Sequence, residues 1–322
     1  MKRISISPPV AALILAVVLF LLSGLLPNGF GSDLDVARAQ ATNILRLAVF
    51  LGVIAAGQTL VIVSGSEGID LSAGSVVTLT AILTYIIVNG VDARVLPALL
   101  VALAVGALVG FVNGVGITFL KISPFVMTLG MSGVVAGAII VITHGNVSGK
   151  VAPLMTRLIA RPLSPSLQIP NAIIIWLLFG IFMWLLLERT TFGKNLFAIG
   201  VNRVTARLSG VNVTAINLLT YSLASALAGF GGFLLVGNTG VVHLQLGQPF
   251  LFPSIAAVAV GGTLLSGGKG SYWGTMAGAI VLTLITSLLT TMQMPDSVRR
   301  MVLGGTLLIL ISIYGRQRAL RQ

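Results

Sequence analysis

A series of long apolar segments separated by short polar ones constrains this chain more than any other feature. Only 8% of its residues are charged, whereas a soluble domain carries roughly 25%. A helix satisfies its own backbone in hydrocarbon and needs about 20 residues to cross it. The predicted fold class is therefore all-α, a polytopic membrane protein with about ten transmembrane helices. The predicted spans are 10–26, 44–63, 71–88, 95–120, 125–143, 171–187, 214–236, 250–265, 274–292 and 298–314.

The remaining length leaves room for one transmembrane domain over 1–322 and no soluble domain. Lys2 and Arg3 precede the first apolar run, as in a signal peptide. The small-x-small pattern at 37–39 lies too far beyond that run for signal cleavage. We therefore expect a retained first span, followed by an outside loop over 27–43.

The distribution of basic residues predicts the orientation. Ten spans place both ends on one side, and the longest internal polar stretch, 189–213, contains Arg189, Lys194, Arg203 and Arg207 but no acid. Lys and Arg concentrate on the cytoplasmic side of membrane proteins. We expect this stretch and both termini to be cytoplasmic. Anionic membrane lipid explains the net charge of +12 better than nucleic acid, because the basic residues are scattered.

A polar break interrupts the apolar pattern at 57–75, where the sequence reads G-Q-T-L-V-I-V-S-G-S-E-G-I-D-L-S-A-G-S. Its carboxylates, Glu67 and Asp70, are costly in a membrane unless they face protein, water or the bilayer surface. A proton-coupling pair is one interpretation, but the spans contain no further acids for a relay. The stretch 64–68 also resembles 266–270, which indicates either a duplication or one tight-turn solution used twice.

Motifs for catalysis are missing. The nearest approach to a phosphate-binding loop, at Gly268 and Lys269, has Thr263 and Gly270 where glycine and Ser or Thr belong. The chain has no cysteine, only two histidines and no zinc motif. Ser and His are present, but the G-x-S-x-G elbow of a serine hydrolase is not. We predict a transport domain that is not an enzyme, with no energy source, metal or cofactor of its own.

The stretch 189–213 has two interpretations, a solvated loop or a docking surface. Its apolar residues alternate with polar ones at near-helical spacing, which is typical of short amphipathic helices resting on a partner. These apolar residues are Phe192, Leu196, Phe197, Ile199, Val204 and Leu208.

Three long motifs then indicate a family. V-I-V-S-G-S-E-G-I-D-L-S-A-G-S at 61–75 resembles the G-G-I-D-L-S-V-G-S signature of the ribose/xylose/galactose-type ABC sugar permeases. T-F-G-K-N-L-F-A-I-G-V-N-R-V-T-A-R-L-S-G-V at 191–211 resembles that family's cytoplasmic loop, and A-A-V-A-V-G-G-T-L-L-S-G-G-K-G-S-Y-W-G-T-M-A-G-A at 256–279 is a third match. The chain departs from the family at Ser66 and Glu67, which add a residue and a charge before Gly68.

The resemblance implies a permease subunit of a binding-protein-dependent importer in the bacterial inner membrane. It implies two permease subunits, two separate ATPase subunits that bind ATP inside, an extracytoplasmic sugar-binding protein, and a fold like that of vitamin B12 importers. It also implies that the loop after the sixth helix couples to the ATPase. The implied coupling residues are Phe192, Gly193, Asn195, Ala198, Gly200, Asn202, Arg203, Ala206, Arg207, Ser209 and Gly210.

A neutral sugar requires hydrogen-bonding groups and aromatic faces rather than counter-ions. On that basis and from the signature motif, the predicted substrate pathway includes Gln58, Gly68, Asp70, Ser72, Gly74, Asn113 and Thr128. Asp70 is the stronger prediction of the two acids, as a helix-break anchor or gate, and Glu67 is expected to face the inner surface. Pentoses, hexoses, other sugars, nucleosides and amino acids stay open as substrates. A stand-alone secondary transporter or channel is the alternative class.

Overall fold

The computed structural model describes residues 7–26, 29–65, 68–162, 169–295, 297–299, 301–302 and 304–305. Within these residues the chain is helical, and its only β-type pairing is an isolated bridge between Pro162 and Pro170. The predicted all-α class is confirmed.

Six helices in the described part of the chain are long and apolar enough to cross a membrane. They are α2 (Leu34–Val63), α4 (Val95–Thr118), α5 (Pro124–Thr143), α7 (Asn171–Trp184, continued by a π-helical turn Leu185–Arg189), α10 (Val213–Thr239) and α12 (Tyr272–Thr291). Three further apolar helices are shorter: α1 (Pro8–Gly24), α3 (Ala73–Val88) and α11 (Leu251–Val260). The tenth predicted span, 298–314, lies mostly outside the described residues.

Two predicted boundaries are wrong. The expected outside loop over 27–43 contains the start of α2, because the Asp33 side chain accepts hydrogen bonds from the backbone N–H groups of Asp35 and Val36 and caps the helix. Hydropathy marks the apolar part of a helix, so it missed residues 34–43, the more polar first turns of α2. The predicted span 250–265 is shortened to α11, which ends at Val260; Gly261 is its C-cap, and Gly262 follows with a φ of +86°.

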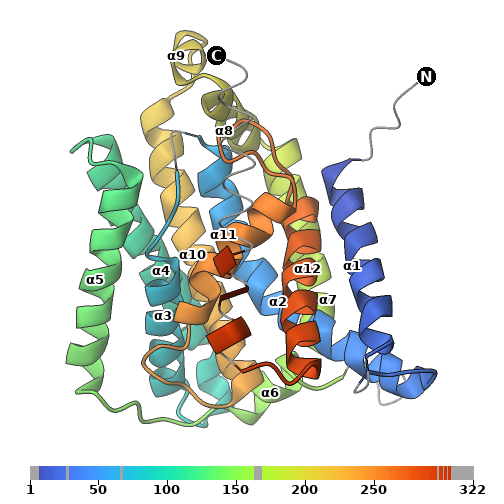
Figure 1. The fold of residues 1–322 in the computed structure, drawn as a ribbon. Helices are drawn as coiled ribbons and strands as arrows, with labels where there is room; N and C mark the ends of the chain where they lie inside the picture. Colours follow the sequence, from blue (N-terminus) through green and yellow to red (C-terminus); the bar gives the residue numbers. More distant parts are fainter. Residues whose placement is uncertain are drawn as a thin grey trace, which may run out of the picture.

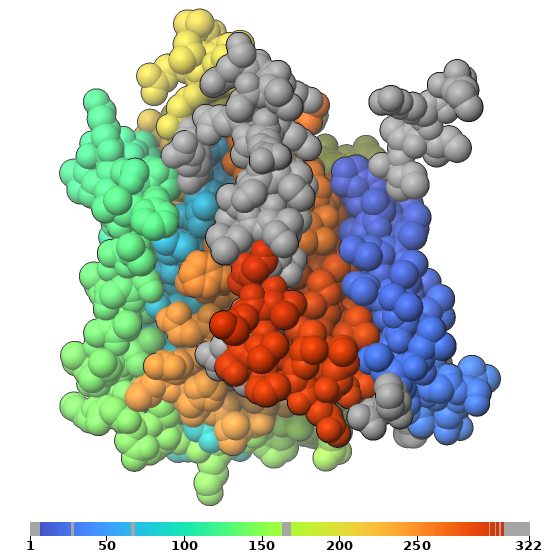
Figure 2. Space-filling view, in the orientation of Figure 1, coloured from blue at the N-terminus to red at the C-terminus, as the bar shows by residue number. Residues whose placement is uncertain are grey.

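The bundle has two distinct ends (Figure 1). The short helices α8 (Thr191–Val201) and α9 (Arg203–Leu208) lie at one end, and α9 protrudes from it in the space-filling view (Figure 2). We call it the α9 end. The third short helix, α6 (Pro153–Ile159), lies at the opposite α6 end, where Asp92 accepts a hydrogen bond from the Leu154 backbone N–H (2.8 Å).

The helices α2 and α10 form the centre of the bundle, with α5 and α1 at opposite edges (Figure 1). Glycines bring α4 and α10 into backbone contact: a Cβ on Gly106 would lie 2.4 Å from the carbonyl oxygen of Ser225, and one on Gly110 would lie 2.0 Å from that of Tyr221. This is the close packing that small residues permit between membrane helices.

Replacing Gly110 with Ala tests this packing against a matched control, Gly130→Ala on α5. A Cβ at Gly130 meets nothing within 4 Å. Alanine favours a helix over glycine by roughly 1 kcal/mol, so Gly130→Ala should leave the melting temperature unchanged or raise it. Gly110→Ala should lower it, because overpacking costs about 1–3 kcal/mol. Thermal unfolding of the purified full chain in detergent measures both. Equal melting temperatures would contradict the close approach of α4 and α10.

Candidate functional site

The polar break forms an interruption within a membrane span. The helix α2 ends at Val63 at the α9 end, and α3 begins only at Ala73. With 16 residues, α3 covers about 24 Å at 1.5 Å per residue, less than the roughly 30 Å of a hydrocarbon core. Between them, the described residues 64–65 and 68–72 are not helical, and Asp70, Leu71 and Ser72 are buried inside the bundle. Glu67 lies outside the described residues, so its predicted position at the inner surface stays a prediction.

Side chains from two helices satisfy the backbone of this interrupted segment. On α2, the Gln58 amide donates to the Asp70 carbonyl oxygen (2.6 Å) and accepts from the Asp70 N–H (3.3 Å). On α5, the Thr128 hydroxyl accepts from the Leu71 N–H (3.0 Å). These contacts substitute for helical hydrogen bonds, which non-helical backbone at membrane depth lacks.

The Asp70 carboxylate joins the start of α3 to α10 directly, and to α4 through the Ser72 hydroxyl. It is 2% exposed and accepts from the Ser72 N–H (2.8 Å), the Ser72 hydroxyl (2.5 Å) and the Ser225 hydroxyl of α10 (3.2 Å). The Asn113 amide of α4 donates to the Ser72 hydroxyl (3.0 Å). Asp70 therefore resembles a capping residue at the start of α3. The groups that donate hydrogen bonds to its carboxylate are all uncharged.

Five of the predicted pathway residues thus meet in one buried network, which consists of Gln58, Asp70, Ser72, Asn113 and Thr128. Ser225 belongs to the same network and was not predicted, because a serine among alanines and leucines carries no local signal. The two predicted glycines, Gly68 and Gly74, allow a close approach of neighbouring backbone. A Cβ on Gly68 would lie 2.6 Å from the Val61 carbonyl oxygen, and a Cβ on Gly74 would lie 3.2 Å from the Gly247 carbonyl oxygen. Their place along a solute path stays a prediction.

The stretch 189–213 forms two short helices, as predicted. The Thr190 hydroxyl caps α8 by accepting from the Gly193 N–H (3.1 Å). The Asn202 side chain caps α9 by accepting from two backbone N–H groups. One face of α8 is buried against the bundle. Of the predicted coupling residues, Gly193 and Ala206 are buried, Phe192, Asn195 and Gly200 are half-buried, and Ala198, Asn202, Arg203, Arg207, Ser209 and Gly210 are exposed.

The exposed side of α8 and α9 has an apolar patch, which consists of Val201, Val204 and Leu208. Their side chains are 72%, 69% and 83% exposed. Because α9 protrudes from the end of the bundle (Figure 2), the patch is accessible to another protein.

A contact between glycines joins α8 to the interrupted span. A Cβ on Gly200 would lie 2.0 Å from the Val63 carbonyl oxygen and 2.5 Å from the Gly268 nitrogen. Gly268 also donates its N–H to the Val63 carbonyl oxygen (2.9 Å). A Cβ on Gly267 would lie 2.4 Å from the Cα of Gly65. The two similar stretches, 64–68 and 266–270, therefore touch each other and α8, and their positive φ angles fit the tight-turn interpretation.

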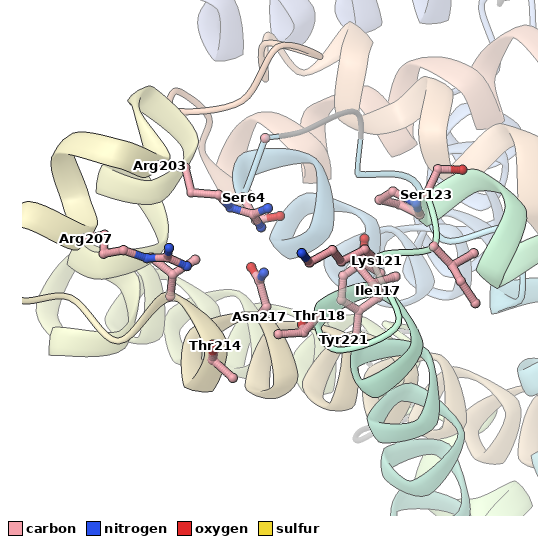
Figure 3. A pocket seen from close by; sticks show the side chains of 14 residues that line it. Ser64, Ile117, Thr118, Lys121, Ser123, Arg203, Arg207, Thr214, Asn217 and Tyr221 are labelled. Atoms are coloured by element: carbon pink, nitrogen blue, oxygen red, sulfur yellow. The ribbon is translucent and has the colours of Figure 1, made fainter.

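A cavity of about 400 Å³ opens at the α9 end beside this contact. It lies between the end of α2, the connection from α4 to α5, α9 and the first turns of α10 (Figure 3). The side chains of Arg203 and Arg207 line this cavity. The two arginines of the predicted coupling segment thus border a space within this subunit.

Comparisons with known proteins give a consistent result. A family model described as "branched-chain amino acid transport system / permease component" matches residues 40–311. The ribose import permease RbsC of Escherichia coli K12 is 31% identical over 317 residues, covering 94% of this chain and 92% of its own. The galactose/methyl galactoside import permease MglC of Salmonella typhimurium is 30% identical over 299 residues, covering 88% and 87%. The autoinducer 2 import system permease LsrC of Escherichia coli is 33% identical over 322 residues, covering 99% and 90%. No solved structure matches.

A graded substitution series tests the capping role of Asp70. Asp70→Ala leaves the buried donors of Ser72 and Ser225 without their acceptor, and each such loss costs about 1–3 kcal/mol. Asp70→Asn keeps one carbonyl acceptor, and Ser225→Ala removes one donor. We expect the melting temperature of the purified chain to fall most for Asp70→Ala and much less for the other two. Equal effects of Asp70→Ala and Ser225→Ala would contradict the capping role.

Proposed function

The chain belongs to the branched-chain amino acid transport system / permease component family, and we propose that it is the transmembrane permease subunit of an ATP-binding-cassette importer for a monosaccharide. The observation that carries the proposal is the near full-length similarity to the ribose and galactose/methyl galactoside import permeases. These relatives are transport subunits and not enzymes. The sugar would be a pentose or a hexose delivered by a periplasmic binding protein.

Two other substrate classes are the alternatives. The family description names branched-chain amino acids, which are zwitterions, and nucleosides are neutral like sugars. We favour a sugar because the curated relatives reported above are mainly sugar permeases. The buried network around Asp70 supports an uncharged solute. Its carboxylate is buried and already accepts hydrogen bonds from three donor groups, so it is not accessible for pairing with a charged substrate.

The proposed complex has two permease subunits, two ATPase subunits and one extracytoplasmic binding protein, and ATP binds only to the ATPases. The exposed apolar patch of Val201, Val204 and Leu208 is the proposed ATPase contact, because such a patch on a protruding element is typical of an interaction site. The binding protein would dock at the α6 end. This assignment places the α9 end, with its basic stretch, in the cytoplasm.

We assign the whole chain, 1–322, to one permease domain in the bacterial inner membrane, with ten helices in the arrangement of vitamin B12 importers. The described residues contribute nine of these helices if α1, α3 and α11 are counted as shorter spans, and the predicted span 298–314 would be the tenth. Pro8 lies against Gly262 at the α9 end, where a Cβ on Gly262 would meet the Cβ of Pro8 at 2.1 Å. The first span therefore starts on the proposed cytoplasmic side.

The proposed mechanism is alternating access driven by the ATPase. Closure of the ATPase subunits would move α8 and α9. Gly200 would transmit the movement to the end of α2 and to the loop before α12, because close packing at Gly200 leaves no room for independent motion. The interrupted segment, with Gln58, Asp70, Ser72, Asn113 and Thr128, would then change access to the path without any bond in the solute being broken.

Val204→Asp tests the proposed ATPase contact. A charge buried in an apolar interface loses its hydration, which costs free energy. We therefore expect at least about tenfold less ATPase to copurify with the variant than with the wild-type chain, which corresponds to a loss of roughly 1.4 kcal/mol in binding free energy. Val241→Asp is the matched control: Val241 is 63% exposed in the connection that follows α10 at the α6 end. Equal copurification of both variants with an ATPase encoded beside this chain would place the contact elsewhere.

Uptake by proteoliposomes tests the transport class. We expect radiolabelled ribose or galactose to enter only when the chain is reconstituted with its ATPase, ATP and the binding protein. Uptake by the chain alone, driven by a solute or proton gradient, would indicate a secondary transporter. ATP-dependent uptake of leucine or a nucleoside, with none of a sugar, would keep the importer class and change the substrate.

A further inference from the structure

The cavity at the α9 end has the chemistry of an anion site. Three cationic side chains line it from two separate segments: Lys121 comes from the connection between α4 and α5, and Arg203 and Arg207 come from α9. The three cationic groups point into the same space (Figure 3). No acidic side chain lines the cavity within the described part of the chain.

Buried polar groups complete the cavity wall. The Asn217 side chain of α10 is 5% exposed and points into the space between Arg203 and Lys121 (Figure 3). The Thr118 hydroxyl, also in the wall, is buried and has no hydrogen-bond partner in the described residues. A buried polar group without a partner costs free energy, which a hydrogen bond to a ligand or water in the cavity would recover.

The backbone at Lys121 is held in an unusual conformation. Its φ angle is +55°, a left-handed value that a non-glycine residue adopts at a cost. The Ile122 N–H donates to the Gly116 carbonyl oxygen (3.2 Å) and closes this turn. The turn brings Lys121 to the wall of the cavity, opposite the arginines of α9 (Figure 3).

The charge of the cavity does not suit a neutral sugar. Partial burial lowers the pKa of Arg203, the neighbouring Tyr221 raises it, and the charge of Arg207 lowers it. The two arginines therefore repel each other, and a bound anion would relieve this repulsion. Guanidinium groups pair with phosphate through charge-assisted hydrogen bonds, and lysine binds it as a point charge.

We propose that the cavity binds the phosphate group of an anion, held by Lys121, Arg203 and Arg207 and oriented by Asn217 and Thr118. The phosphate has two possible sources, the headgroup of an anionic phospholipid or a soluble phosphate ester. Pro124 of the wall is followed in the chain by Phe125 and Val126, whose side chains are exposed on the first turn of α5. This apolar surface would accommodate acyl chains of a lipid whose headgroup enters the cavity.

The test uses the purified full chain without its ATPase, so it is independent of transport and of the docking surface. The site variant carries Lys121→Gln, Arg203→Gln and Arg207→Gln. The control carries Arg189→Gln, Lys194→Gln and Lys269→Gln, three cations of the same end that do not line the cavity. Both variants lose the same charge. Asn217→Leu is a further variant that keeps every charge and removes only the buried amide.

Two arms distinguish the sources. In the lipid arm, native mass spectrometry counts phosphatidylglycerol and phosphatidylcholine retained by the chain from mixed micelles. In the soluble arm, the melting temperature is measured in inorganic phosphate and in glucose 6-phosphate, against chloride at equal ionic strength. We expect the wild-type chain to prefer one of the two phosphate sources. The site variant should bind that source at least about tenfold more weakly than wild type. Asn217→Leu should also bind it more weakly, and the control variant should bind it as tightly as wild type.

Each contrary outcome overturns the proposal. Wild type that prefers neither phosphatidylglycerol nor soluble phosphate has no phosphate site. An equal loss in the site and control variants would show a general effect of positive charge at this end. If Asn217→Leu binds as tightly as wild type, the polar wall has no part in binding and the proposed site geometry is wrong. All variants must retain the wild-type elution profile and a cooperative thermal transition, so that failure to fold is not scored as failure to bind.

Discussion

The structure depends on one constraint, that backbone polar groups at membrane depth must find hydrogen-bond partners inside the protein. The segment between α2 and α3 is the place where a helix does not supply them. Gln58 pairs with both backbone groups of Asp70, and Thr128 accepts from Leu71. The interruption is therefore tolerated because α2 and α5 substitute their side chains for the missing helical bonds.

The same segment is joined to the α9 end through glycine. Gly65 and Gly267 are in backbone contact, and Gly200 lies against Val63 and Gly268. Such contacts have no flexible side chain between them, so in the proposed mechanism a displacement of α8 would be passed on to the end of α2 and to the loop before α12. This is a physical route by which a partner bound at α9 would reach the interrupted span. It rests on packing, and the proposed mechanism requires only that the packing have two arrangements.

Polar groups in this chain serve two different purposes. Around Asp70 they hydrogen-bond to one another in the interior of the bundle, and no cationic side chain takes part, which fits an importer of an uncharged solute. Around Lys121, Arg203 and Arg207 they converge on a cavity and lack a partner of opposite sign in the described residues. The two groups of polar residues therefore have different chemistry, and the proposed phosphate site is separate from the proposed solute path.

Much of the architecture follows from the sequence alone. Apolar segments identified the helical membrane class, since hydrocarbon permits few other structures, and family motifs identified the permease class. The near-helical spacing of Phe192 to Leu208 predicted α8 and α9 because amphipathic periodicity is a local property. The sequence could not place the start of α2 or the end of α11, because a capping aspartate and a glycine with positive φ lie outside the hydropathy signal. Nor could it assign partners. Ser225 meets Asp70 across 155 positions, and Arg207 meets Lys121 across one cavity, because only the folded bundle brings distant segments together.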